Sequence, residues 1–153
     1  MFREGASNTL VSPSRVGTSR PQPGTPRDLV KVMLAAAARL ARRPHLKSAR
    51  TLLARSGEEL ATMLDPERRP DWAWFEIVFE DDACRLPAAL LRAGRALGRD
   101  DFVERGTETL EWMLRGRVLG RCQSALRDAC EAAFAATGDM HWLSIAARLQ
   151  RLD

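Results

Sequence analysis

The chain has no tyrosine and only two histidines and three cysteines among its 153 residues. The histidines, His45 and His141, stand at no spacing from the cysteines that is typical of a zinc site. The cysteines, Cys84, Cys122 and Cys130, form no Cys-x-x-Cys pair. An odd number of cysteines favours free thiols in a reducing compartment. The sequence therefore predicts no metal site and a cytoplasmic protein.

Several motifs that define large functional classes are also missing. The sequence contains no glycine-rich phosphate loop, no Gly-x-Ser-x-Gly and no His-Glu-x-x-His. No apolar run approaches the ~20 residues that span a bilayer, and residues 1–27 lack the apolar core of a signal peptide. A sugar-nucleotide-binding fold needs alternating strands and helices over a longer chain. These absences argue against nucleotide hydrolysis, the usual serine hydrolases, zinc proteases and a whole glycosyltransferase. We also expect no cofactor and no membrane partner.

Alanine, leucine and arginine are abundant instead. Hydrophobic residues make up 45% of the chain and charged residues 29%, which is typical of one globular domain. The net charge of +4 comes mostly from arginine, which can indicate a nucleic-acid partner. Alanine, leucine and arginine together are also typical of proteins from GC-rich bacteria. We favour that origin and do not expect nucleic-acid binding.

Prolines, glycines and serines interrupt residues 1–24, and we predict a disordered tail there. Residues 25–153 are predicted to form a single helical domain. Its first helix begins at Thr25-Pro26-x-Asp28, where threonine caps, proline suits the first turn and aspartate favours the positive helix end. The residues expected on its inner face are Leu29, Val32, Met33, Ala36 and Leu40.

The second helical run begins near His45 and extends to Leu64. Ser56-Gly57-Glu58-Glu59 in its middle has the pattern of a capping box, so the run is either two short helices or one kinked helix. Its basic side, with Lys47, Arg50 and Arg55, is interpreted as a solvated face.

The sequence after Pro87 predicts helices that end at Gly98, Gly116 and Gly138. Asp101-x-x-Glu104 is expected to cap one of them and Asp139 the last, whose inner face would hold Trp142, Ile145, Leu149 and Leu152. Residues 96–103 resemble residues 136–143 at an offset of 40, each with glycine, acid and then an aromatic residue. A repeat of this length predicts an all-α array of six or seven helices in stacked antiparallel hairpins, either a solenoid or a partial toroid.

The stretch from Trp72 to Pro87 differs from the rest of the chain. It holds two of the four tryptophans, two of the five phenylalanines and the acids Glu76, Glu80, Asp81 and Asp82. Aromatic faces beside carboxylates are typical of a sugar-binding cleft, because rings pack on the C–H face of a pyranose and carboxylates accept bonds from its hydroxyls. The alternative is that these rings belong to the core and the acids to a solvated turn.

The same stretch resembles a known family. Trp-x-Trp-Phe-Glu, then an acid and Arg-Leu-Pro before an Ala/Leu-rich helix, is similar to a helical domain of the six-hairpin glycosidase-like, (α/α) toroid class that follows bacterial glycosyltransferase modules. The family pattern after the glutamate reads Leu-Thr-Tyr-Asp-Asn-Ala-Arg-Leu-Pro. Asp82, Arg85, Leu86 and Pro87 fit that pattern, whereas Glu80, Asp81 and Ala83 replace its Thr, Tyr and Asn. The resemblance covers roughly the second half of the chain.

The resemblance implies a carbohydrate-related domain, with a saccharide or a glycosyltransferase module as partner. Its site would be Trp72, Trp74, Glu76, Asp82 and Arg85, with the rings stacked on a sugar and the acids bonding hydroxyls. Because Arg85 stands close to four acids in the sequence, we separately predict that it pairs with Glu76 or Asp82. Because the chain is too short for a closed toroid, we expect a truncated member with weak or no catalysis. The alternative is a helical-repeat module that binds a protein partner.

Overall fold

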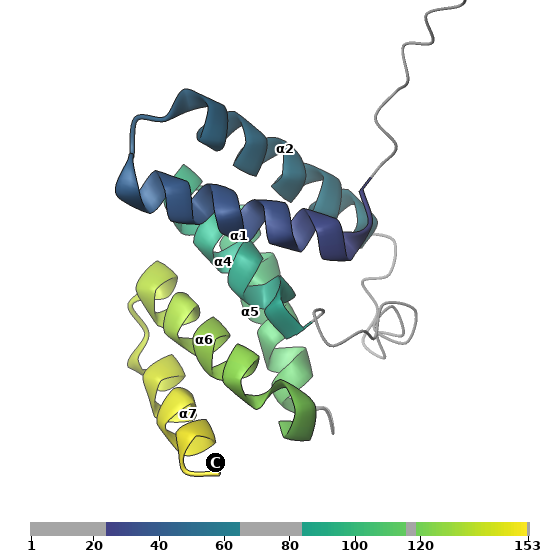
Figure 1. Ribbon diagram of the computed structural model, residues 1–153. Helices are drawn as coiled ribbons and strands as arrows, with labels where there is room; N and C mark the ends of the chain where they lie inside the picture. Colours follow the sequence, from purple (N-terminus) through teal and green to yellow (C-terminus); the bar gives the residue numbers. More distant parts are fainter. Residues whose placement is uncertain (1–23, 65–83, 116–118, 153) are drawn as a thin grey trace, which may run out of the picture.

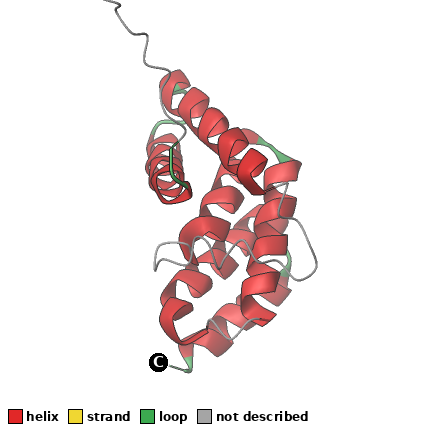
Figure 2. Ribbon diagram, turned by 90° about the vertical axis from the view of Figure 1, so that its right-hand side faces the viewer, coloured by secondary structure: helices red, strands yellow, loops and turns green. Residues whose placement is uncertain are grey.

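A computed structural model describes residues 24–64, 84–115 and 119–152, and its regular elements there are all helical (Figures 1 and 2). This confirms the all-α prediction. The Trp72–Phe79 segment and residues 1–23 lie outside the described residues. The helices are α1 (Pro26–Arg42), α2 (Lys47–Leu64), α4 (Leu86–Leu97), α5 (Asp100–Arg115), α6 (Leu119–Thr137) and α7 (Met140–Gln150).

The helices form three packed hairpins, α1–α2, α4–α5 and α6–α7. Helix α4 lies at the centre, because it packs against α1 on one side and α6 on the other as well as against its own partner α5. Within the described ranges, the α1–α2 and α6–α7 hairpins stand at opposite ends of an open array (Figure 1). The stacked hairpins expected from the repeat are therefore confirmed.

The sequence of α4 explains its central place. Eight of its residues are buried, and they occur on more than one face of the helix. A helix that is apolar over much of its circumference is stable only when neighbours cover it. Helices α1 and α6 have one apolar face each and provide that cover. The buried residues of α4 are Leu86, Pro87, Ala88, Ala89, Leu90, Leu91, Ala93 and Gly94.

The predicted start of the first helix is confirmed in detail. The Thr25 hydroxyl oxygen accepts a hydrogen bond from the Asp28 amide at 3.2 Å, and Pro26 opens the helix. Gly24, the first described residue, donates its amide to Glu59 of α2 at 3.0 Å. The prediction that Val32 lies in the core was wrong. Val30 is buried and Val32 is only half-buried, because α1 turns Val30 toward the other helices.

Residues Lys47–Leu64 form one helix, so Ser56–Glu59 does not start a new helix and the alternative of two short helices was wrong. Gly57 does not begin a helix but permits close packing between helices. A β-carbon placed on Gly57 would lie 2.6 Å from the ring of Phe102, far inside contact distance. The glycine therefore allows the first turn of α5 to approach the middle of α2.

The 40-residue repeat corresponds to two similar turns. Gly98 and Gly138 have φ values of 66° and 73°, a conformation that glycine adopts without the cost paid by other residues. Each turn is followed by a helix whose buried aromatic residue, Phe102 or Trp142, enters the core. Asp139 caps α7 by accepting the His141 amide at 2.9 Å, as predicted.

Two other predictions for this part were wrong. Asp101 lies inside α5, which begins at Asp100, so it does not precede the helix, and its carboxylate accepts two hydrogen bonds from Arg99, each at 2.8 Å. Leu152 is 70% exposed, because α7 ends at Gln150 and leaves it beyond the packed turns.

Arg99 links two hairpins electrostatically. Its guanidinium bonds Asp101 and also Glu58 of α2 at 3.1 Å, and it lies 4.3 Å from the centre of the Phe102 ring. The hydrogen bond from Arg99 holds the pKa of Asp101 below its ordinary value of 3.8, and the bonds to Asp101 and Glu58 raise the pKa of Arg99.

This pair predicts an acid-dependent part of the stability. Because the folded-state pKa of Asp101 is depressed, its stabilising effect is present above the ordinary pKa of 3.8 and is lost as the pH falls through the folded value. Asp101→Asn should lower the melting temperature at pH 6, and its difference from wild type should shrink as the pH falls below 3.8. The pair is partly exposed, so the effect should stay below ~1 kcal/mol. Asp100→Asn removes a neighbouring charge and serves as the control. If the melting temperatures of Asp101→Asn and wild type differed by the same amount at every pH, the Arg99–Asp101 pair would not be the source of the pH dependence.

Candidate functional site

The predicted carbohydrate site is only partly visible. Trp72, Trp74, Glu76 and Asp82 lie outside the described residues, so their arrangement is not described. Arg85 is exposed and immediately precedes α4. Leu86 and Pro87, which follow it, are buried in the first turn of that helix. The Arg-Leu-Pro sequence therefore begins a packed helix, as expected.

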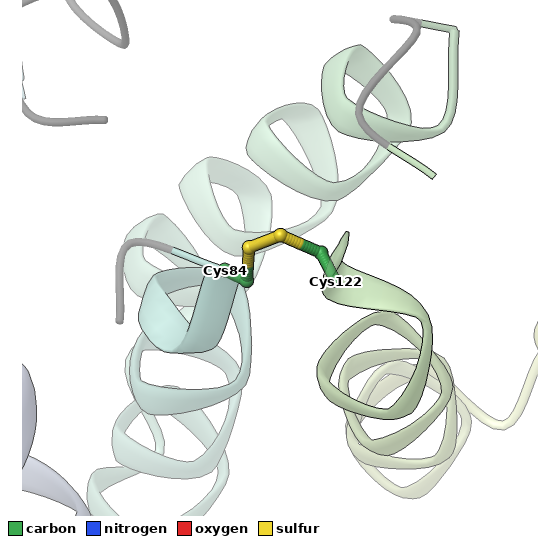
Figure 3. Close-up of a disulfide and its surroundings, with 2 residues drawn as sticks. All are labelled: Cys84 and Cys122. Carbon is green, nitrogen blue, oxygen red and sulfur yellow. A yellow bond between two sulfur atoms is a disulfide. The ribbon is translucent and has the colours of Figure 1, made fainter. Parts of the chain in front are cut away.

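Two of the three cysteines are joined. Cys84, just before α4, and Cys122, in the second turn of α6, form a disulfide with a Cα–Cα distance of 5.7 Å (Figure 3). The expectation of three free thiols was wrong for this pair, because the packing of α4 against α6 brings together residues 38 positions apart. Cys130 is free and buried. Burial and the charge of Glu131 raise the pKa of its thiol to about 11, so it is a poor nucleophile at neutral pH.

A groove of about 580 Å³ lies between α1 and α4 and reaches the first turn of α2. Its floor is made of small and aliphatic side chains, and the charged residues among its described lining are all arginines. Volumes of ~300–1,000 Å³ are typical of sites that bind a molecule. The lining residues are Leu34, Ala37, Ala38, Leu40, Ala41, Pro44, Arg50, Arg92, Arg95 and Ala96.

The three arginines at this groove differ in their contacts. Arg50 donates to the Ala96 carbonyl near the end of α4 at 3.3 Å, so it is not the purely solvated residue that the sequence predicted. Arg92 forms an ion pair with Asp128 of α6 at 2.6 Å. Arg95 is exposed and has no hydrogen-bond or ion-pair partner among the described residues. One guanidinium is therefore available to a ligand, and a second is already oriented by its carboxylate.

Sequence reasoning missed this groove. The only signal was the alternation of alanine and arginine near the ends of two helices, which is equally typical of a solvated helical face. The groove exists because α1 and α4, more than 40 residues apart, pack side by side.

A shallower pocket of about 250 Å³ lies between α5 and α7. His141 and Trp142 line it, with ring centres 5.8 Å apart. Trp142 is only 5% exposed, so its ring offers little surface for stacking on a ligand. We regard this pocket as a consequence of core packing.

The described residues contain no cluster of three or more His, Cys, Asp or Glu side chains able to hold a metal ion. Among the same residues, no helix combines the length and the apolar character needed to cross a bilayer. None of the protein-family models, curated proteins or solved structures compared with the chain gives a significant match.

Proposed function

We propose that this protein is a helical-hairpin interaction module that binds a partner protein. The observation that carries the proposal is the groove between α1 and α4, with its apolar floor and arginine rim. Stacked helical hairpins present extended surfaces on which a partner segment can lie. Apolar contact supplies affinity in such a groove, while charged groups at its rim select the partner.

A second candidate is a carbohydrate-related domain like those that follow bacterial glycosyltransferase modules, truncated and with weak or no catalysis. It is supported by the motif and by the way Arg85, Leu86 and Pro87 lead into a buried helix within packed hairpins. In this proposal Trp72 and Trp74 stack on a sugar, and Glu76 and Asp82 bond its hydroxyls.

The cytoplasmic location also stays a proposal. Glutathione and thioredoxin keep most cytosolic thiols reduced, so a stable Cys84–Cys122 disulfide would favour an oxidising compartment. Trapping the thiols with an alkylating reagent during cell lysis tests this. Recovery of reduced Cys84 and Cys122 in the cytosolic fraction would support the proposed location, whereas recovery of the protein with an intact Cys84–Cys122 bond outside that fraction would overturn it.

One binding experiment separates the two functions. The full chain, shown to be folded by circular dichroism, is presented to a glycan array and to a phage library of random 16-residue peptides. The interaction-module proposal expects peptide binders with micromolar or better affinity and no glycan above background. Glycan binding that Trp74→Ala abolishes, without peptide binding, would favour the carbohydrate-related domain instead.

A further inference from the structure

We infer that the groove between α1 and α4 binds an acidic amphipathic helix of a partner protein. This inference rests on the proposed function and identifies the chemistry of the partner. Three properties of the groove point to it: its length along α1, the small side chains of its floor, and the single sign of the charge at its rim.

The length matches a few turns of helix. The residues that α1 contributes run from Leu34 to Ala41, and Pro44 extends the wall beyond the helix end. At a rise of 1.5 Å per residue, the helical part of this wall from Leu34 to Ala41 is about 10 Å long, or about two turns of a bound helix. A groove recognises a bound helix by contacting its apolar residues at positions i, i+3, i+4 and i+7, which span a similar length.

The floor favours close approach of another helix. Ala38 and Ala41 on α1 are exposed, and Ala96 on α4 is partly exposed. The distance between packed helices depends on the side chains at the contact, so alanine permits a short one. Leu34, which is half-buried, adds a larger apolar contact at one end. The apolar side of a partner helix can therefore enter this space.

The rim favours a negatively charged partner. Arg92 and Arg95 stand on α4 and Arg50 on α2, and none of the described residues that line the groove is acidic. Arg95 has no partner among the described residues, whereas Arg92 already bonds Asp128. Guanidinium groups recognise carboxylates through paired hydrogen bonds. A partner helix with Asp or Glu along the edge facing α4 would form an ion pair with Arg95. It would also bond Arg92, which already pairs with Asp128.

The floor also argues against nucleic acid as the occupant. A phosphate backbone is held by cations and hydrogen-bond donors along its path. Here seven of the ten described lining residues are alanine, leucine or proline, and α1 contributes no cation or hydrogen-bonding side chain to the described lining. Phosphates crossing this floor would lose water without gaining donors.

The experiment starts from peptides selected on the full chain in the phage library. The best binders are synthesised with a fluorescent label, and their affinities are measured by anisotropy. We compare wild type with Arg95→Glu, which reverses the unpaired charge, and with Ala38→Trp, which fills the groove from an exposed position. Arg148→Glu is the matched control, because it makes the same charge change on an exposed residue of α7, at the far end of the array (Figure 1).

We expect the selected peptides to be acidic with apolar residues at helical spacing. Arg95→Glu and Ala38→Trp should each weaken binding at least ~10-fold, and Arg148→Glu less than ~2-fold. The affinity should also fall as salt is raised. Basic or non-periodic binders, or binders unaffected by both groove variants, would overturn this inference while leaving an interaction module elsewhere on the surface. The absence of any peptide binder would overturn the proposed function itself, and this inference with it.

Discussion

Replacing Phe102 with alanine is expected to lower the free energy of unfolding by ~3–5 kcal/mol, the cost typical of removing a buried aromatic side chain. Phe102 has no exposed surface and is among the largest fully buried side chains of the described core. Its ring lies over Gly57 of α2 and beneath the Arg99 guanidinium. The variant therefore loses contacts between two hairpins as well as the burial of the ring.

Urea unfolding followed by circular dichroism measures this effect, and Phe102→Leu serves as the milder control. A second substitution tests the packing directly. Gly57→Ala alone should destabilise the protein, because its β-carbon would lie 2.6 Å from the ring. In the Phe102→Leu background the same change should cost much less, or even stabilise the helix, since alanine is the better helix former. Additive effects of the two changes would show that Gly57 and Phe102 do not contact each other.

Reducing the Cys84–Cys122 disulfide is expected to cost ~2–4 kcal/mol of stability. The bond closes a loop of 38 residues, so its loss restores considerable freedom to the unfolded chain. It also removes the covalent link between Cys84, just before α4, and Cys122 of α6 (Figure 3). The α6–α7 hairpin should therefore become the least stable part of the array.

The measurement is urea unfolding with and without dithiothreitol. Wild type should lose stability on reduction, and the Cys84→Ser/Cys122→Ser variant should be equally unstable under both conditions. Cys130→Ala controls for the loss of a buried thiol, and its stability should still fall when dithiothreitol is added. Three reactive thiols in the unfolded, unreduced protein would contradict the disulfide, since only Cys130 should react.

The sequence by itself determined the helical class and most helix boundaries. Thr25-Pro26-x-Asp28, Gly98, Gly138 and Asp139 act within one turn of the chain, through capping bonds and backbone conformation. Such signals can be recognised without knowing the tertiary structure. The 40-residue repeat likewise predicted hairpins, because each copy contains its own turn and its own buried aromatic residue.

The tertiary structure alone decided features that join distant residues. Gly57 has the pattern of a helix start until Phe102 is placed against it, and Cys84 and Cys122 look like free thiols until α4 packs on α6. The groove depends in the same way on α1 lying beside α4. The motif residues Trp72, Trp74, Glu76 and Asp82 remain a prediction from sequence. Local rules describe one turn of backbone, whereas these contacts depend on which helix faces meet, and that is set by the packing of the whole core.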